Sequence, residues 1–178
     1  MLAINTVPHL HYTIDNHDIT IRPMRPEDTK LEEDFVNNLS ATTKYFRFME
    51  GIGKLSPAML HQLCDIDGKH AMAFIATIKD ESGEKQIGVG RYASGKLETD
   101  SELESELALA IADDWHHKGI DKLIMQPLIE YAKNNGIKRL YALEFAENIA
   151  MKKIAKELGM TAKVDPEDTT LVSYSLAI

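Results

Sequence analysis

The stretch ELALAIADDWHHKGIDKLIM, Glu106 to Met125, runs from an apolar segment through a polar loop into an amphipathic segment. Residues 105–112 are apolar with little alternation, which predicts a central strand buried on both faces. Residues 122–136 have helical spacing, with Gly136 as a stop signal. Between them, Gly119 lets the backbone approach a ligand, and the first helical amides lack internal partners. This order is compatible with an anion site at the helix start, although spacing alone favours an ordinary strand-to-helix turn.

The rest of the chain predicts strands and helices that would pack around one mixed sheet, with helices covering both faces. Pro127, inside the helical segment, is expected to kink it or remove one hydrogen bond. Residues 1–18 have poor periodicity and are interpreted as an extension, either flexible or an edge strand. The further strands are expected at 19–24, 71–78, 86–94, 137–144, 160–164 and 169–176, and the further helices at 26–40, 56–65 and 147–159.

The composition is that of an ordinary globular domain, with 178 residues, 44% of them hydrophobic and 27% charged. No apolar run approaches the roughly 18 residues of a membrane helix. The first residues have neither a basic segment nor a long apolar stretch, so we expect no secretion signal there. Cys64 is the only cysteine, which fits a reducing cytoplasm, and its place in a predicted helix favours a core role over a nucleophile. The net charge of -8 argues against nucleic-acid binding and is compatible with a cationic substrate.

The N-terminal histidines His9, His11 and His17 raise the question of a metal site. No acidic or cysteine partner lies at a recognised ligand spacing from them, so we predict no bound metal.

Five segments of the chain occur in an order known from one protein family: ITIRPMRPED, LSATTKYFRFMEGIGKLSP, IGVGRYA, ELALAIADDWHHKGIDKLIM and AENIAMKKIAKELGM. Through these segments the chain, from about Ile19 to Leu176, resembles the GNAT superfamily of acetyl-CoA-dependent N-acyltransferases. Within it, the chain is most similar to the acetyltransferase domain of bacterial Pat-type protein lysine acetyltransferases. The resemblance implies a single GNAT-type α/β (α+β) domain over residues 19–178, preceded by the 1–18 extension, with acetyl-CoA as the acyl donor.

The pyrophosphate loop of this family reads Gln or Arg, two residues, Gly, one residue, then Gly or Ala, and this chain has His116, Gly119 and Asp121 there. The family's contacts are mainly backbone N–H groups, so the resemblance still implies coenzyme A binding. A carboxylate at Asp121 is expected to oppose a phosphate by about 1 kcal/mol at 4 Å, unless it turns outward or caps local amides. A protonated His116 would partly replace the missing Arg or Gln.

The resemblance also implies that the pantetheine arm runs along the end of the 105–112 strand, where the strand separates from its neighbour. Asn148 matches a family asparagine that faces the cofactor, although its residue type alone equally suits a helix N-cap. The residues so assigned to acetyl-CoA are Leu109, Ala110, Ile111, His116, His117, Lys118, Gly119, Ile120, Asp121, Lys122 and Asn148.

Acetyl transfer to an amine needs a base, because a free lysine amine has a pKa of about 10.4 and is mostly protonated at pH 7. Glu106 matches the glutamate of the Pat-type strand and is therefore our candidate base, with Ala108 and Ala110 as small neighbours. Without the resemblance, its place at the end of an acidic run favours a solvated surface residue. Many GNAT enzymes use a tyrosine of the last helix as general acid, and that position here is Ala155.

Three functions stay open at this point. The first is acetyl-CoA-dependent acetylation of a protein lysine, the second is the same chemistry on a small amine, and the third is a GNAT-fold module that binds a ligand or partner without catalysis. The third function stays open because His116, Asp121 and Ala155 differ from the residues usual in the family. The sequence does not determine whether the chain is a monomer or a dimer, and any regulation by a further domain would need a separate partner.

Overall fold

The computed structural model describes residues 7–49, 53–94 and 104–178. They form one eight-stranded sheet in the order β1-β2-β3-β4-β5-β6-β8-β7. Its one parallel neighbour pair within the described residues is β5 with β6. The strands are β1 (Leu10–Ile14), β2 (His17–Pro23), β3 (Ala71–Asp80), β4 (Gly83–Ala93), β5 (Glu104–Ile111), β6 (Arg139–Phe145), β7 (Thr161–Val164) and β8 (Leu171–Ala177).

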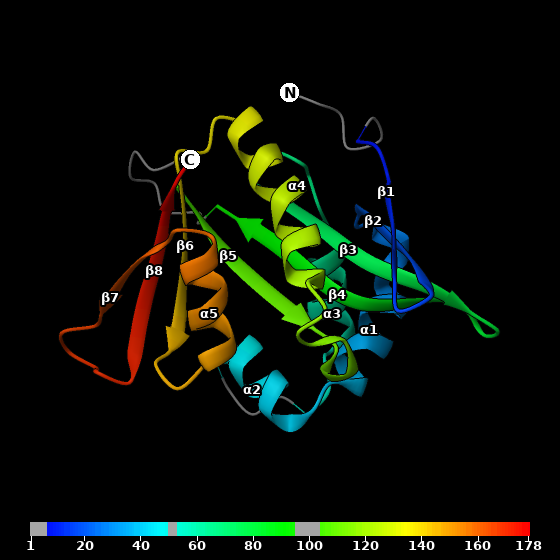
Figure 1. The fold of residues 1–178 in the computed structure, drawn as a ribbon, viewed down its shortest axis with the longest axis horizontal. Helices are drawn as coiled ribbons and strands as arrows, with labels where there is room; N and C mark the ends of the chain where they lie inside the picture. The colour runs from blue at the N-terminus through cyan, green and yellow to red at the C-terminus, as the bar shows by residue number, and fades with distance from the viewer. Residues whose placement is uncertain (1–6, 50–52, 95–103) are drawn as a thin grey trace.

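Helices cover both faces of the sheet, with α4 and α5 on one face and α1 and α3 on the other (Figure 1). This confirms the expected fold class, a mixed central sheet flanked by helices on both faces. No described helix is long and apolar enough to cross a membrane. The helices are α1 (Thr29–Asn38), α2 (Ala41–Phe48), α3 (Pro57–Cys64), α4 (Ile120–Asn134) and α5 (Ile149–Glu157), with 3-10 turns at Pro26–Asp28 and Asp113–Trp115.

Most element boundaries follow local signals in the sequence. Ser56 caps α3 as expected, since its hydroxyl accepts a hydrogen bond from the amide of Met59 at 3.2 Å, and Pro57 occupies the first helical position. Gly159 follows α5 with a φ of 71°, a left-handed conformation that suits glycine at a helix end. Helix α4 continues through Pro127, so the proline removes one hydrogen bond without ending the helix.

Two elements differ from the expected order of strands and helices. Residues 10–14 of the extension form the edge strand β1, one of the two alternatives left open for that segment. Helix α2 was not expected, because Thr42 and Thr43 are β-branched and weak helix formers. Ser40 nevertheless caps it, accepting a hydrogen bond from the amide of Thr43 at 3.1 Å.

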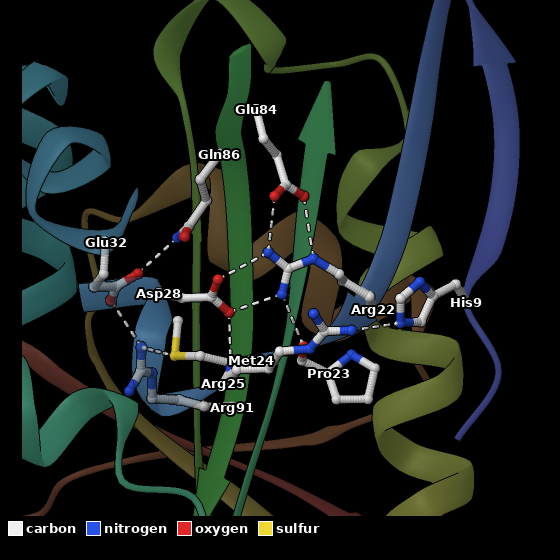
Figure 2. Close-up of polar contacts among 10 residues, drawn as sticks. All are labelled: His9, Arg22, Pro23, Met24, Arg25, Asp28, Glu32, Glu84, Gln86 and Arg91. Carbon is white, nitrogen blue, oxygen red and sulfur yellow. Dashed lines mark hydrogen bonds and ion pairs between the residues drawn. The ribbon is translucent and has the colours of Figure 1, made fainter. Parts of the chain in front are cut away.

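A buried network of charged side chains joins α1 and the turn before it to β2 and β4 (Figure 2). The guanidinium of Arg22 donates to both carboxylate oxygens of Asp28, at 2.7 and 2.8 Å, and to those of Glu84, at 3.1 and 3.2 Å. Glu32, only 1% exposed, accepts from Arg91 at 2.8 Å and from Gln86 at 2.6 Å. Because each buried charge has a hydrogen-bonded partner, α1 is held in one position on the sheet.

Two glycines of β4 let α4 pack closely on the sheet. A Cβ atom at Gly90 would lie 2.6 Å from Cγ2 of Ile124, and one at Gly88 would lie 2.9 Å from Cδ1 of the same isoleucine. Ile124 is fully buried and β-branched, so it has little room to move. The glycines therefore set how near the axis of α4 comes to β4, and with it where the N-terminus of the helix lies.

We predict that Gly90→Ala destabilises the protein by about 1–3 kcal/mol, because the added methyl group overpacks the contact with Ile124. Urea unfolding followed by circular dichroism measures this change. Gly53→Ala is the matched control, since a Cβ there meets no atom within 4 Å and should leave the free energy of unfolding nearly unchanged. Equal stability of both variants would contradict the close packing of α4 on β4.

Candidate active site

The central feature of the site is the separation of the parallel strands β5 and β6. They pair only through Glu104↔Arg139, Ser105↔Leu140 and Glu106↔Tyr141. Beyond these pairs β5 remains bonded to β4, and β6 remains bonded to β8, so the two strands diverge towards their C-terminal ends (Figure 1). Backbone groups of β5 beyond Glu106 that face β6 thus have no strand partner among the described residues and are available to a ligand.

A cavity of about 290 Å³ opens along this separation, between α2, α4 and α5. Its wall combines the end of β5, the loop that follows it, and the facing sides of α2 and α5. The lining residues are Thr43, Phe46, Arg47, Leu109, Ala110, Ile111, Trp115, His116, His117, Gly119, Asp121, Lys122, Glu144, Asn148, Ala150, Met151, Lys153, Ile154 and Glu157.

The N-terminus of α4 meets this cavity and carries no side-chain cap. Its N-cap is Gly119, with a φ of 80°, which is a left-handed conformation that favours glycine. The amides of residues 120–122 precede the first helical hydrogen bond and so have no partner within the helix. Together with the helix dipole, such free amides attract an anionic group, and phosphate binding at this helix start stays a prediction.

Side-chain contacts hold the loop between β5 and α4 in place. The carboxylate of Asp113 accepts from the amide and the hydroxyl of Ser40, at 2.8 and 2.7 Å, and from the hydroxyl of Thr43 at 2.7 Å. Burial acts to raise the pKa of Asp113, but these hydrogen bonds outweigh it and lower the pKa below its ordinary value. Nε2 of His116 lies 3.0 Å from the carbonyl oxygen of Ile111. The loop is thereby tied both to α2 and to the end of β5.

The structure brings most of the residues assigned to acetyl-CoA together around the cavity. The side chain of Lys118 does not line it, because it forms an ion pair with Asp15 in the turn between β1 and β2. Ile120 is also absent from the wall, since its side chain is fully buried in the core beneath α4. The assigned residues that do line the cavity are Leu109, Ala110, Ile111, His116, His117, Gly119, Asp121, Lys122 and Asn148.

Glu106 lies at the last pair of the β5–β6 ladder and is exposed, outside the cavity lining. Alternate residues of a strand share a face, so Glu106 lies on the same face as Ala110. Ala110 packs in the core with α1 and α3, and α2 crosses β5 on that side. Glu106 is therefore reached from the face opposite α4 and α5.

Asn148 has a structural role at the start of α5. Its Oδ1 accepts from the amide of Met151 at 3.1 Å, which makes it the N-cap of the helix. Its Nδ2 donates to Oε2 of Glu144 at 3.0 Å. The N-cap interpretation of this asparagine is thus confirmed, and its side chain also borders the cavity.

Four charged residues of the cavity wall were not assigned to the site from the sequence: Arg47, Glu144, Lys153 and Glu157. The first two are the ones with shifted pKa values. Arg47 belongs to the unexpected helix α2 and makes no hydrogen bond to the described residues, although its guanidinium lies 4.9 Å from the ring centroid of Phe48. Burial, followed by the charge of Arg91, lowers the pKa of Arg47 to about 10. Glu144 follows Leu140 and Ala142 at alternate positions of β6, so it lies on the apolar face of that strand. A carboxylate on an apolar face is unusual, and this was the signal in the sequence that could have identified it.

Burial also governs the pKa of Glu144 and of Cys64. The pKa of Glu144 is raised to about 7 by burial, with the hydrogen bond from Asn148 and the charge of Arg47 opposing the rise and the charge of Glu106 adding to it. Cys64 is 1% exposed, and burial raises the pKa of its thiol to about 11. A thiol protonated at neutral pH is a weak nucleophile, which agrees with the core role expected for this cysteine.

The family description "Acetyltransferase (GNAT) domain" matches residues 18–161. Acetyltransferase PA5475 of Pseudomonas aeruginosa is 38% identical over 164 residues, which cover 92% of this chain and 86% of that protein. Acetyltransferase Pat of Mycolicibacterium smegmatis is 28% identical over 139 residues, which cover 78% of this chain but only 40% of that longer protein.

Solved structures share the fold. The GNAT domain of S. lividans PAT superposes with a TM-score of 0.83 at 22% identity, over 96% of this chain and 97% of that one. The protein yncA of Salmonella typhimurium, solved with its cofactor acetyl-CoA, superposes with a TM-score of 0.71 at 16% identity, over 89% and 93% of the two chains. Both likenesses concern the arrangement of the sheet and its helices.

We predict that Asp121→Asn tightens the binding of acetyl-CoA about fivefold. The substitution removes a carboxylate from the first turn of α4, and the repulsion between this carboxylate and a bound phosphate is about 1 kcal/mol. Isothermal titration at low and high salt measures this change, which should shrink as salt screens the charge. Glu130→Gln, on the same helix but outside the cavity lining, is the matched control and should leave the affinity unchanged. Weaker binding by Asp121→Asn would mean that this carboxylate supports the site.

Proposed function

The chain belongs to the GNAT acetyltransferases, and we propose that it moves the acetyl group of acetyl-CoA to the ε-amine of a protein lysine. One observation carries the proposal: the uncapped N-terminus of α4 and the unpaired backbone of β5 border the same cavity. A diphosphate and an amide-containing arm need these two kinds of partner, amides for an anion and free strand edges for peptide-like groups. The substrate acetyl-CoA combines both groups in one molecule.

We propose that acetyl-CoA lies with its pyrophosphate on the amides of 120–122 and its pantetheine arm along residues 109–111 of β5. The amide groups of the arm would form hydrogen bonds with the backbone of β5, as a short added strand does, where β6 no longer pairs with it. The lining side chains of Lys122 and Lys153 supply positive charge near the phosphate end. Part of the charge of Lys122 is already compensated, because its Nζ lies 3.1 Å from Oε2 of Glu157.

Glu106 is the proposed general base. Glu106 lies at the last β5–β6 pair, on the face of the sheet away from α4 and α5. An acceptor amine could therefore reach the thioester from one face of the sheet while acetyl-CoA enters from the other. A carboxylate there can take a proton from the amine, directly or through water, as nitrogen attacks the thioester carbonyl. An unpaired amide of β5 could stabilise the oxyanion that forms.

A lysine acceptor is supported by the charge of the chain as well as by its resemblance to Pat-type enzymes. The net charge is -8, and Glu106 is exposed on the proposed acceptor side. Acidic surfaces favour encounter with basic segments. Most of the acidic run that ends at Glu106 falls within residues 95–103, which lie outside the described residues. The single, buried Cys64 agrees with the reducing cytoplasm that we propose as the location.

The acceptor class can be tested by comparing amines at equal concentration. Release of free coenzyme A would be followed with acetyl-CoA plus lysine-containing peptides, and separately with spermidine and with free amino acids. We expect acetylation of the peptides, verified by mass spectrometry at a lysine side chain. Faster turnover of the free amines than of every peptide would replace the lysine proposal with a small-amine acceptor.

We predict that Glu106→Gln lowers kcat by at least about 100-fold while leaving acetyl-CoA affinity within twofold of the original. The reason is that glutamine keeps the size of the side chain but accepts no proton. Steady-state kinetics and isothermal titration measure the two effects. Glu104→Gln is the matched control, since it removes a carboxylate of the same strand that pairs with Arg139 at 2.8 Å, and it should keep normal activity. Full activity of Glu106→Gln would overturn the assignment of the base.

A further inference from the structure

A second carboxylate, Glu144, stands at the strand separation on the other side of the sheet from Glu106. The side chains of Leu140 and Ala142 pack in the core beneath α4 and α5, and Glu144 continues that row along β6. It lines the cavity that receives the donor in the proposed function, whereas Glu106 does not. The two carboxylates thus flank the strand separation from opposite faces.

Within the part of the chain that the structure describes, Glu144 uses only one of its two carboxylate oxygens in a hydrogen bond. Because Oδ1 of Asn148 accepts from the amide of Met151, the asparagine must present its Nδ2 group to Glu144. Oε2 of Glu144 therefore acts as an acceptor at 3.0 Å. Oε1 makes no hydrogen bond to the described residues. When the carboxyl group is protonated, the proton therefore belongs on Oε1, where it can be donated into the cavity.

The chemistry of the reaction needs a proton donor on the donor side. Breaking the C–S bond releases a thiolate, and an ordinary thiol has a pKa of about 8.5. The last-helix position that holds a tyrosine in many GNAT enzymes is Ala155, which has no hydroxyl and is 1% exposed. Among the carboxylates of the cavity wall, Glu144 is the one on β6, at the separation from β5 itself.

We propose that Glu144 is the general acid of the reaction and that its Oε1 donates a proton to the sulfur of coenzyme A as the thiolate leaves. The inference rests on the proposed function. The pKa of Glu144, raised by burial to about 7, means that a large share of the group carries the proton at neutral pH. A carboxylic acid of that pKa can protonate a thiolate whose conjugate acid is weaker.

The step balances without a further reactant. The amine nitrogen forms a bond to the thioester carbon, and Glu106 receives the proton that the nitrogen loses. As the carbonyl re-forms, the C–S bond breaks, its electron pair goes to sulfur, and Glu144 supplies the proton that gives the free thiol. Glu106 then releases its proton to solvent and Glu144 takes one up, so the net products are the acetylated amine and coenzyme A.

Several charged groups surround Glu144 and contribute to its titration. Arg47 of α2 favours the ionised form, whereas Glu106 of β5 favours the protonated form. On the β8 side stands Tyr174, whose own pKa is raised by burial and then by the charge of Glu144. The remaining titratable side chains of the same cavity wall are His116, His117, Asp121, Lys122, Lys153 and Glu157.

We predict that kcat of the wild-type enzyme, at saturating acetyl-CoA and amine, falls as pH rises above about 7, because an acid catalyst is lost when it ionises. Glu144→Gln should lower kcat at pH 7 about 100-fold and should lack this falling limb. Glutamine keeps an oxygen to accept from Asn148, so acetyl-CoA affinity and thermal stability should hardly change. Glu147→Gln, an exposed neighbour, is the matched control and should keep both the rate and the pH profile.

Each outcome bears on the proposal. A low rate without a falling limb in Glu144→Gln, together with normal acetyl-CoA binding, supports it. An active wild-type enzyme whose Glu144→Gln variant has the same rate and the same falling limb overturns this inference but leaves the proposed function intact. A wild-type enzyme that binds acetyl-CoA but acetylates no amine overturns both.

Discussion

The separation of β5 from β6 is the constraint on which the rest of the site depends. Each strand is fully bonded on its outer side, β5 to β4 through Ile111 and β6 to β8 through Phe145, so neither can close the opening without breaking its own half of the sheet. The unpaired backbone therefore has to be satisfied by water or by a ligand. A site of this kind is a property of the sheet, and it survives changes in the side chains around it.

The helices are arranged around that opening. The glycines of β4 set the depth of α4, so its free amides lie at the mouth of the cavity. Asp113 bonds the loop between β5 and α4 to the start of α2, and Asn148 bonds the start of α5 to β6. The N-termini of α2, α4 and α5 are thus fixed by contacts close to the strand ends. Of these three, α2 and α5 have a side-chain cap and α4 has none.

Much of this arrangement follows from local sequence signals. The apolar run of β5, the glycine before α4 and the Ser–Pro start of α3 are short-range features, and the structure agrees with them. The assigned cofactor residues cluster because most of them belong to one continuous loop. In the same way, the fold class followed from the alternation of strand and helix patterns.

Features that depend on tertiary contacts could not be predicted. The ion pair between Lys118 and Asp15 joins residues 103 positions apart, and nothing local indicates it. Helix α2 contains weak helix formers and is held by its contacts with β5 and with Asp113, which lie far from it in the sequence. The raised pKa of Glu144 depends on its burial in the folded chain, in a cavity wall that it shares with residues of α2 and α5. The sequence alone could give only its position on the apolar face of β6.

The loop also carries an optical property of the protein. Trp115 is the only tryptophan in the chain, and it lies in the cavity wall with the ring of His17 at 5.3 Å and the ammonium of Lys118 at 5.7 Å from its own ring. All indole fluorescence of the protein therefore originates at this one wall. A ligand in the cavity changes the surroundings of the indole, so the emission spectrum of the unlabelled protein can report on occupancy.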